Sequence, residues 1–398
     1  MRRETRPAVL PVVFAAIFAL APARAAFCQM PFAVFGARQA ALGGAAVALG
    51  DDPAGFMNNP ALLNPAGTSY AGSLGVLATS GADFYPLVKG VAGNDPAELA
   101  TPGSPNAGAV RANLAALAAP GVGALAEHHS GLVSVTNGWG VAVSYSGWNG
   151  AFARPDLVHV QSGTDPATSF AANTSVAAFR ALSVEDYAIS RAIPLIQGNL
   201  MLGVTGHYLR GTAGIKEEDL FTTGTGRLDN FVRRGSSGGI DRTRSRFSWD
   251  AGLLVTIGVL RIGAVMNGIN RPQFPYDDQT TPAGERGRTV TIGQQTRAGA
   301  SVKIPGTGLT VAADLDLRAN ETLVDGLSSR VAGGGLEWLI SSFALRGGLS
   351  IDLEAPDRPK VLSGGLGWQS GTFRADVSAT YRSNDGALGG VATLRVGI

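Results

Sequence analysis

Residues 372–382 read TFRADVSATYR, and apolar and polar side chains alternate along the whole stretch. Phe373 and Val377 lie on one face of an extended chain, whereas Arg374 and Asp376 lie on the other. Successive side chains of a strand point to opposite faces, so this period of two predicts a β-strand with one apolar and one polar side. The same alternation returns in 297–304, 309–318 and 343–352.

The predicted strands are about ten residues long, close to the roughly 9–11 residues that cross a bilayer at a tilt. Strands of soluble sheets are shorter, at about 5–6 residues. Short and long connections alternate along the chain, as in outer-membrane barrels with short periplasmic turns and long external loops. The sequence therefore predicts an all-β fold, a 14-stranded antiparallel transmembrane β-barrel. Its strands are expected near 68–78, 130–136, 139–147, 180–192, 199–210, 248–257, 259–267, 291–304, 309–318, 329–339, 342–352, 360–369, 372–382 and 389–398.

The composition excludes several other classes of protein. Only 16% of the 398 residues are charged, against roughly 25% in an average soluble protein. The net charge of +2 argues against disorder and against a nucleic-acid partner. A single cysteine excludes a disulfide framework and a multi-cysteine zinc site.

The first 25 residues read as a signal peptide. Arg2 and Arg3 precede an apolar stretch at 8–21, and an A-x-A site predicts cleavage after Ala25. That stretch is shorter than the roughly 20 residues of a spanning helix. An exported chain of predicted membrane strands belongs in the bacterial outer membrane, with lipid as its first partner.

The barrel is expected to occupy residues 67–398, with two long inserts. Residues 83–128 carry a helical pattern with Asp95 as an N-cap, and predict a helical insert after the first strand. Residues 211–246 are rich in Arg and predict a long polar external loop. The five Trp are expected at strand ends, in interfacial aromatic girdles.

Residues 26–66 form an apolar, Gly/Ala-rich segment that predicts an N-terminal hatch in the barrel lumen. Asp52 precedes Pro53 and Asn59 precedes Pro60, which are two cap-and-start signals for short helical turns. Arg38 can pair with a lumen carboxylate such as Asp314, Asp316 or Asp376. The predicted lumen charges are Arg38 from the hatch and, from the inward-facing parity of the strands, Asp314, Asp316, Arg318, Arg346, Arg374 and Asp376.

Chemistry-bearing motifs are scarce. The four His lack metal-ligand spacing, and no phosphate-binding glycine motif opens a helix. Gly235-Ser236-Ser237-Gly238-Gly239 matches G-x-S-x-G only literally, because it lies in a Gly/Ser/Arg loop rather than between a strand and a helix. We therefore expect neither an enzyme nor a cofactor or metal site.

The segment 41–52, followed by Asn59-Pro60-Ala61, resembles the FadL-like superfamily of outer-membrane proteins that transport hydrophobic compounds. The form Asn59-Pro60-Ala61-Leu62-Leu63, with a helical insert after strand one, looks most like its TraF-like branch, with PorV-like proteins close by. The resemblance implies a hatch-plugged barrel of fourteen strands. The residues it places in the hatch or beside an apolar ligand pocket are Phe32, Phe35, Asp51, Asp52, Phe56, Met57, Asn58, Asn59, Pro60 and Ala61.

Three functions stay open at this point. The leading one is passive uptake of a hydrophobic small molecule past the hatch. The second is a protein-binding or assembly role, PorV-like in secretion or TraF-like in conjugation. The third, an outer-membrane hydrolase, needs a Ser, a His and an acid that converge on one spot.

Overall fold

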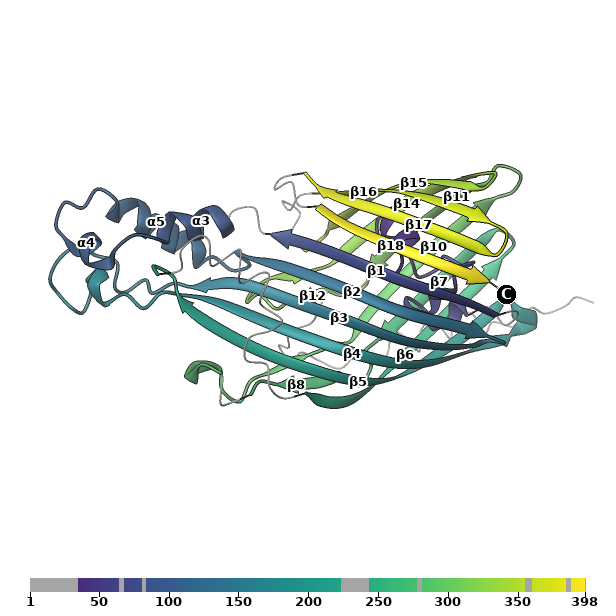
Figure 1. Ribbon diagram of the computed structural model, residues 1–398, viewed down its shortest axis with the longest axis horizontal. Helices are drawn as coiled ribbons and strands as arrows, with labels where there is room; N and C mark the ends of the chain where they lie inside the picture. The colour runs from purple at the N-terminus through teal and green to yellow at the C-terminus, as the bar shows by residue number, and fades with distance from the viewer. Residues whose placement is uncertain are drawn as a thin grey trace, which may run out of the picture.

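The computed structural model describes residues 35–63, 68–80, 84–222, 243–277, 281–354, 360–383 and 388–397. Within these residues, fourteen antiparallel strands form a closed barrel, and the last strand pairs with the first (Figure 1). The predicted fold is confirmed. Closure leaves no backbone edge unpaired in lipid.

All fourteen predicted strands are present in the barrel. Two additional hairpins lie in connections that the sequence left as loops, β8 (Gln273–Pro275) with β9 (Thr289–Thr291) and β12 (Asn320–Glu321) with β13 (Ser328–Ser329). The wall consists of β1 (Thr68–Ser80), β2 (Gly123–Thr136), β3 (Trp139–Arg154), β4 (Val176–Leu195), β5 (Leu200–Asp219), β6 (Arg244–Ile257), β7 (Leu260–Asn267), β10 (Gln295–Ile304), β11 (Leu309–Asp316), β14 (Val331–Ile340), β15 (Phe343–Asp352), β16 (Val361–Ser370), β17 (Phe373–Arg382) and β18 (Leu388–Gly397).

The alternation places polar side chains inside the barrel and apolar ones outside. In β11, Ala312 and Asp314 are buried while Val311 is exposed on the outer surface. In β17, Arg374 is buried and Val377 is exposed. An apolar outer face on a closed barrel is what a bilayer demands, and it indicates an outer-membrane protein.

The short connections lie together at one end of the barrel, where the C-terminus also lies (Figure 1). The β2–β3 turn, for example, consists of Asn137 and Gly138, which both have positive φ and form a tight two-residue hairpin turn. We take this end as periplasmic, because barrels of this class have short periplasmic turns.

The wall is much longer on one side than on the other. β4 and β5 have 20 residues each, whereas β14 to β18 have 10 each. A strand rises about 3.3 Å per residue, so β4 spans roughly 66 Å, about twice what a tilted membrane strand needs. The long strands therefore project beyond the bilayer on the external side.

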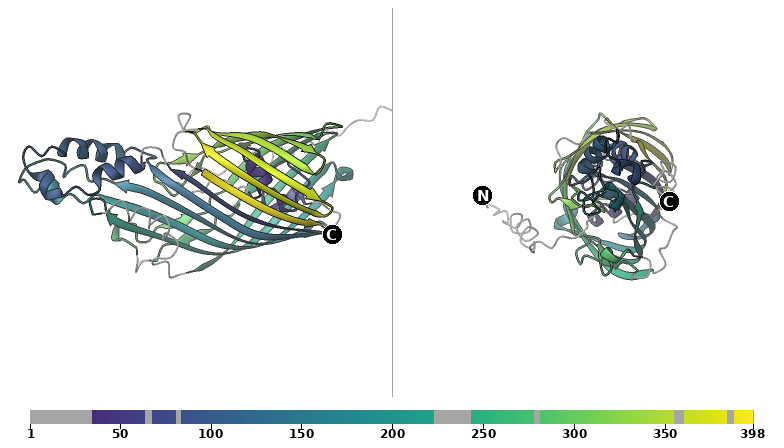
Figure 2. Two further views of the ribbon diagram at one scale, coloured as in Figure 1. Left: turned by 45° about the horizontal axis from the view of Figure 1, so that its top comes forward. Right: turned by 90° about the vertical axis from the view of Figure 1, so that its left-hand side faces the viewer.

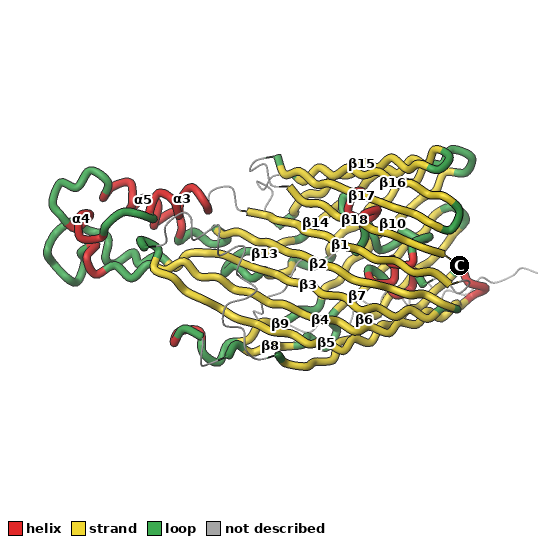
Figure 3. Tube along the Cα trace, viewed as in Figure 1, coloured by secondary structure: helices red, strands yellow, loops and turns green. Residues whose placement is uncertain are grey.

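The helical insert sits at the far end of these long strands (Figures 2 and 3). It contains α3 (Phe84–Val91), α4 (Pro96–Ala100), which Asp95 caps as predicted, and α5 (Ala107–Leu117). Leu99, Val110 and Leu114 pack into a small core with the 3-10 turn η3 (Phe170–Ala172) and the upper ends of β3 and β4. None of the helices in the described residues is long and apolar enough to cross a membrane.

Both inserts are shorter than the sequence suggested. The helical insert expected over 83–128 ends earlier, because β2 begins at Gly123. The external loop expected over 211–246 is strand at both ends, since β5 continues to Asp219 and β6 begins at Arg244. Charged residues occur in these extensions because a strand beyond the bilayer has no lipid-facing side.

Three of the five Trp lie at or near strand ends as predicted, whereas Trp148 and Trp249 lie within β3 and β6. Trp139, Trp249, Trp338 and Trp368 are exposed on the outer face. Trp148 lies in the middle of β3, at a position whose side chain points into the barrel, and it borders a cavity in the lumen.

Candidate functional site

Residues 35–63 lie inside the barrel as a chain of short turns. They contain α2 (Ala37–Ala41), the 3-10 turn η1 (Pro53–Met57) and the 3-10 turn η2 (Pro60–Leu62). Asp52 and Asn59 cap the two 3-10 turns by accepting from the backbone N–H groups of Ala54 and Ala61, as the sequence predicted. We call these residues the lumen segment.

Two hydrogen bonds close the lumen segment on itself. The Asn58 side chain accepts from the N–H of Phe35 at 2.8 Å and donates to its carbonyl at 2.8 Å. Asn59 is also fully buried, and its amide donates to the carbonyls of Val47 and Leu253. These contacts hold the two ends of the segment together and against β6.

Glycines in the wall let the backbone of the segment lie directly on the strands. A Cβ at Gly203 of β5 would lie 2.1 Å from the carbonyl carbon of Pro60, and one at Gly252 of β6 would lie 1.9 Å from Oδ1 of Asn59. On β14, a Cβ at Gly333 would lie 1.9 Å from the carbonyl oxygen of Gly43. The high glycine content of the chain thus has a packing reason, since only glycine permits these approaches.

A buried ionic network, the anchor cluster, joins the segment to β14, β15 and β17. Arg38 donates to both carboxylate oxygens of Glu337, at 2.9 and 2.7 Å. Arg346 contacts Glu337 at 2.7 Å and Asp376 at 2.8 Å, and Arg374 contacts Asp376 at 2.8 Å. Arg38 does have a lumen carboxylate as its partner, as predicted, but that carboxylate is Glu337 rather than Asp314, Asp316 or Asp376.

The three other predicted lumen charges have different positions. Asp314 accepts from the backbone N–H groups of Ala46 and Val47, at 2.7 and 2.9 Å. Asp316 pairs with Arg297 at 2.6 Å. Arg318 lies beyond the end of β11 and is therefore not on the barrel wall.

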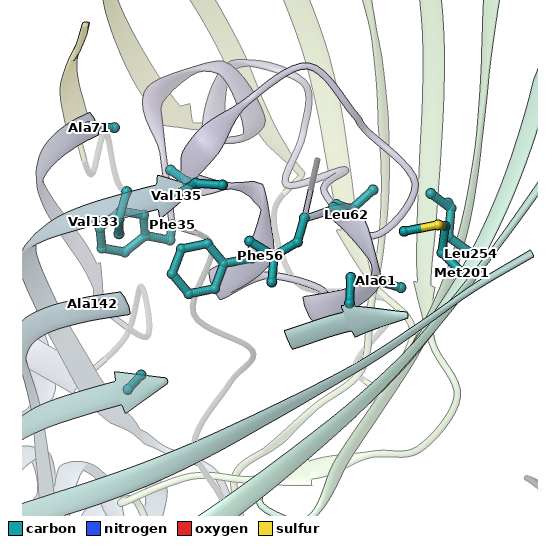
Figure 4. Packing of buried hydrophobic residues seen from close by; sticks show 14 of the residues in the cluster. Phe35, Phe56, Ala61, Leu62, Ala71, Val133, Val135, Ala142, Met201 and Leu254 are labelled. Atoms are coloured by element: carbon teal, nitrogen blue, oxygen red, sulfur yellow. The ribbon is translucent and has the colours of Figure 1, made fainter. Parts of the chain in front are cut away.

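The remaining predicted hatch residues divide into exposed and buried ones. Asp51 is exposed and has a positive φ of 67°, while Asp52 accepts from the Gln39 side chain at 3.0 Å. Phe56 and Ala61 are packed among inward side chains of β1 to β6 (Figure 4). Pro60 is buried, and Phe32 falls outside the described residues.

A cavity of about 160 Å³ borders the lumen segment on the external side of this apolar cluster. Phe35 and Met57 line it, as predicted, whereas Phe56 does not. The lining of this cavity combines apolar and polar side chains. Its apolar members are Phe35, Met57, Trp148, Val184, Leu209 and Ile292, and its polar members include Asp186, His207, Asp250, Asn267 and Gln295.

The polar side of the cavity is dominated by Asp186, His207 and Asp250, which we call the cavity triad. His207 Nδ1 lies 3.0 Å from both carboxylate oxygens of Asp186, and Nε2 lies 3.0 Å from Oδ2 of Asp250. Asp250 Oδ1 also accepts from the N–H of Gly268 at 2.8 Å. The three side chains come from the neighbouring strands β4, β5 and β6.

Sequence reasoning did not single out the cavity triad. Glu185 and Asp186 are adjacent in β4, so their side chains point to opposite faces of the barrel wall. Glu185 faces outward, where it pairs with Arg210 at 3.0 Å, and Asp186 faces the lumen. The alternation along β4, β5 and β6 could have shown that these three side chains point into the barrel. That they lie next to one another follows only from the register between the strands.

Within the described residues, no group of three or more His, Cys, Asp or Glu side chains is arranged to hold a metal ion. The G-x-S-x-G match at 235–239 falls outside the described residues.

Several solved proteins are similar to this chain in structure. The Ralstonia pickettii toluene transporter TbuX has 16% sequence identity and a TM-score of 0.47, with 92% of this chain and 98% of that chain covered. The Pseudomonas putida toluene transporter TodX has 10% identity and a TM-score of 0.49, with 92% and 99% covered. A Pseudomonas aeruginosa FadL homologue has 12% identity and a TM-score of 0.45, with 93% and 99% covered.

No curated protein matches the chain. A family model does match, over residues 59–316, which is more than half of the sequence and includes the Asn59-Pro60-Ala61 motif. The predicted PorV-like link has no counterpart among these findings and stays a prediction. The chain belongs to the family described as F plasmid transfer operon, TraF, protein.

Proposed function

We propose that this protein is an outer-membrane barrel for the passive uptake of a small hydrophobic molecule, with the lumen segment as its hatch. The observation that carries the proposal is the cavity beside Phe35 and Met57. It lies in the lumen and borders the segment that blocks the way to the periplasmic end. A cavity of about 160 Å³ is close to the roughly 150 Å³ that accommodates one benzene molecule.

The hatch would have a fixed part and a movable part. Residues near Arg38 are held by the buried anchor cluster, so this part stays in place. The clasp between Asn58 and Phe35 consists of two hydrogen bonds at the edge of the cavity. A ligand that displaces the Phe35 ring strains this clasp, and opening it would clear a path past η1.

The proposal assigns roles to the predicted site residues. Phe35 and Met57 contact the ligand, and Asn58 holds the clasp. Asp52 and Asn59 cap the turns that carry Met57 and Ala61, and Pro60 fixes the turn against Gly203. Asp51 lies between the fixed and movable parts of the hatch, and its carboxylate lies 3.9 Å from the guanidinium group of Arg261.

Deleting residues 26–50 tests the hatch directly. The deletion removes no wall strand, so the barrel should still form, as judged by its heat-dependent shift on gels. It should conduct small ions across a planar bilayer at least several times better than the full chain, because a large part of the lumen filling is gone. A folded deletion protein no leakier than the full chain would overturn the hatch assignment.

A matched substitution separates gating from mere blockage. Asn58→Ala removes both bonds of the clasp, and should raise uptake of labelled ethylbenzene by intact cells without the general leak of the deletion. Asn94→Ala, in the helical insert, is the control and should leave uptake unchanged.

A role in secretion or conjugation remains a prediction, and loss of plasmid transfer with normal ethylbenzene uptake in a deletion strain would favour it instead.

A further inference from the structure

The cavity triad carries a net negative charge. Both ring nitrogens of His207 lie 3.0 Å from carboxylate oxygens, on Asp186 and on Asp250. A neutral imidazole has one N–H, so only the doubly protonated ring can donate to both sides. One positive ring between two carboxylates leaves a net charge of −1.

Nothing in the cavity wall balances that charge. The described lining residues include no Lys and no Arg. The three side chains are largely shielded from solvent, at 11% exposure for His207, 15% for Asp186 and 13% for Asp250. A poorly hydrated negative charge is unfavourable without a compensating cation, and the cavity next to it is where such a cation can bind.

Other lining residues have polar atoms with no partner. Within the described residues, Asn267 Oδ1, Trp148 Nε1 and His129 Nε2 are buried and make no hydrogen bond. Buried polar atoms are normally satisfied, and Asn267 Oδ1 is the one of the three that is always an acceptor, whereas the indole N–H of Trp148 can only donate. Asn267 follows Asp250 around the barrel, on β7, and adds an acceptor on the negative side of the cavity.

The rest of the lining suits a compact apolar body that carries a cation. Phe35 and His129 lie with their ring centroids 5.8 Å apart, and Trp148 belongs to the same lining. Aromatic faces attract ammonium groups as well as apolar surfaces. The volume limits the ligand to about one ring with a short substituent.

We propose that this cavity binds a small organic ammonium ion, a primary amine on a single-ring apolar body, and that Asp186, His207 and Asp250 select it. The inference rests on the proposed uptake function and narrows its substrate class from hydrophobic molecules in general to hydrophobic amines. Asp186 and Asp250 face the ammonium group, Asn267 accepts a hydrogen bond from it, and Phe35 and Met57 hold the ring against the lumen segment.

Calorimetric titration of the detergent-solubilised full chain tests the proposal with three probes of similar size. Benzylamine carries the cation, ethylbenzene is its neutral isostere, and benzoate is the anion. Benzylamine should bind about tenfold tighter than ethylbenzene, the factor that corresponds to about 1.4 kcal/mol. Benzoate should bind at least tenfold more weakly than benzylamine. This comparison uses the natural sequence and needs no variant.

Two neighbouring carboxylates provide the matched variants. Asp186→Asn keeps the shape of the cavity and removes one charge, and should lower benzylamine affinity about tenfold while ethylbenzene affinity stays the same. Glu185→Gln removes the adjacent charge on the outer face and should change neither. Equal binding of benzylamine and ethylbenzene, or an Asp186→Asn protein that retains full preference for benzylamine, would overturn the selectivity proposal.

The outcomes also distinguish this proposal from the proposed uptake function. If ethylbenzene binds and enters cells but benzylamine has no advantage, uptake stands and amine selection fails. If no probe binds and cells with and without the protein take up ethylbenzene equally, the uptake function itself fails.

Discussion

Two of the charged clusters in the lumen lie on opposite walls, and they differ in what surrounds them. The anchor cluster, on β14, β15 and β17, includes Arg38 from the lumen segment, and every charged member contacts an opposite charge. The cavity triad, on β4, β5 and β6, receives nothing from the segment and borders open volume. Charged residues that point into the lumen thus have different roles in the anchor cluster and in the cavity triad.

This difference shows how to interpret charges inside a plugged barrel. Where the lumen segment supplies the counter-charge, the cluster holds the segment in place. Removing one partner then leaves an uncompensated charge in a buried position without water. Where the lumen segment leaves space, a ligand can supply the counter-charge. A substitution in such a cluster should then lower the free energy of unfolding less. The following predictions test that distinction, in decreasing order of expected effect.

Glu337→Gln should have the largest effect. Glu337 accepts from Arg38 and Arg346, and its loss leaves two buried guanidinium groups without their main partner. Breaking a buried pair costs about 3–5 kcal/mol of unfolding free energy, which urea unfolding in detergent can measure. Asp186→Asn, beside the cavity, should cost less, and equal costs would remove the distinction between the clusters.

Leu315→Arg should cost about 2–4 kcal/mol if the residue lies near the bilayer midplane. Its side chain faces outward from β11, seven residues from the short turn at Gly308. From the sequence alone, Asp316→Ser would be much milder because Asp316 faces the lumen. The buried pair with Arg297 at 2.6 Å changes that expectation, so Asp316→Ser should cost a similar amount. A negligible cost for Asp316→Ser would contradict the ion pair.

Gly203→Ala should cost about 1–3 kcal/mol through overpacking. The new methyl group would collide with the backbone of Pro60, so either β5 or η2 must move. Limited proteolysis should then cut the lumen segment faster than in the natural protein. Gly347→Ala is the matched control, since nothing lies within 4 Å of its Cβ position. Equal stability of the two variants would mean that the segment does not rest on β5.

Glu185→Gln should have the smallest effect, at no more than about 1 kcal/mol. Its partner is Arg210, and the two side chains are 47% and 46% exposed on the outer face. The same unfolding titration applies. A loss larger than that of Asp186→Asn would show that the two neighbours face the other way.

Local patterns in the sequence predicted the strands well. Features that depend on the register between distant strands could not be predicted from the sequence. Period-two alternation is imposed residue by residue at the boundary between lumen and lipid, so all fourteen strands could be located. The ends of β4 and β5 could not, because a strand that continues past the bilayer loses the lipid that enforces the pattern.

The same division applies to the site. The caps at Asp52 and Asn59 were predictable, since a cap and its turn are adjacent in sequence. The partner of Arg38 was not, because Glu337, Asp314 and Asp376 all face inward and only the register decides which one meets the guanidinium. The inward position of Trp148 was missed because Trp alone does not reveal its side of the strand.

The contacts of the lumen segment also set an order for folding. Arg38 bonds to a residue 299 positions later, and Ala37 donates to Thr393, 356 positions later. These bonds cannot form until nearly the whole chain has been synthesised and exported, and contacts of such long sequence separation form slowly. Until then an apolar stretch of about thirty residues remains without its binding surface, and exposed apolar surface of this kind promotes aggregation. The protein should therefore depend on periplasmic chaperones more strongly than a barrel whose lumen is filled by its own nearby loops.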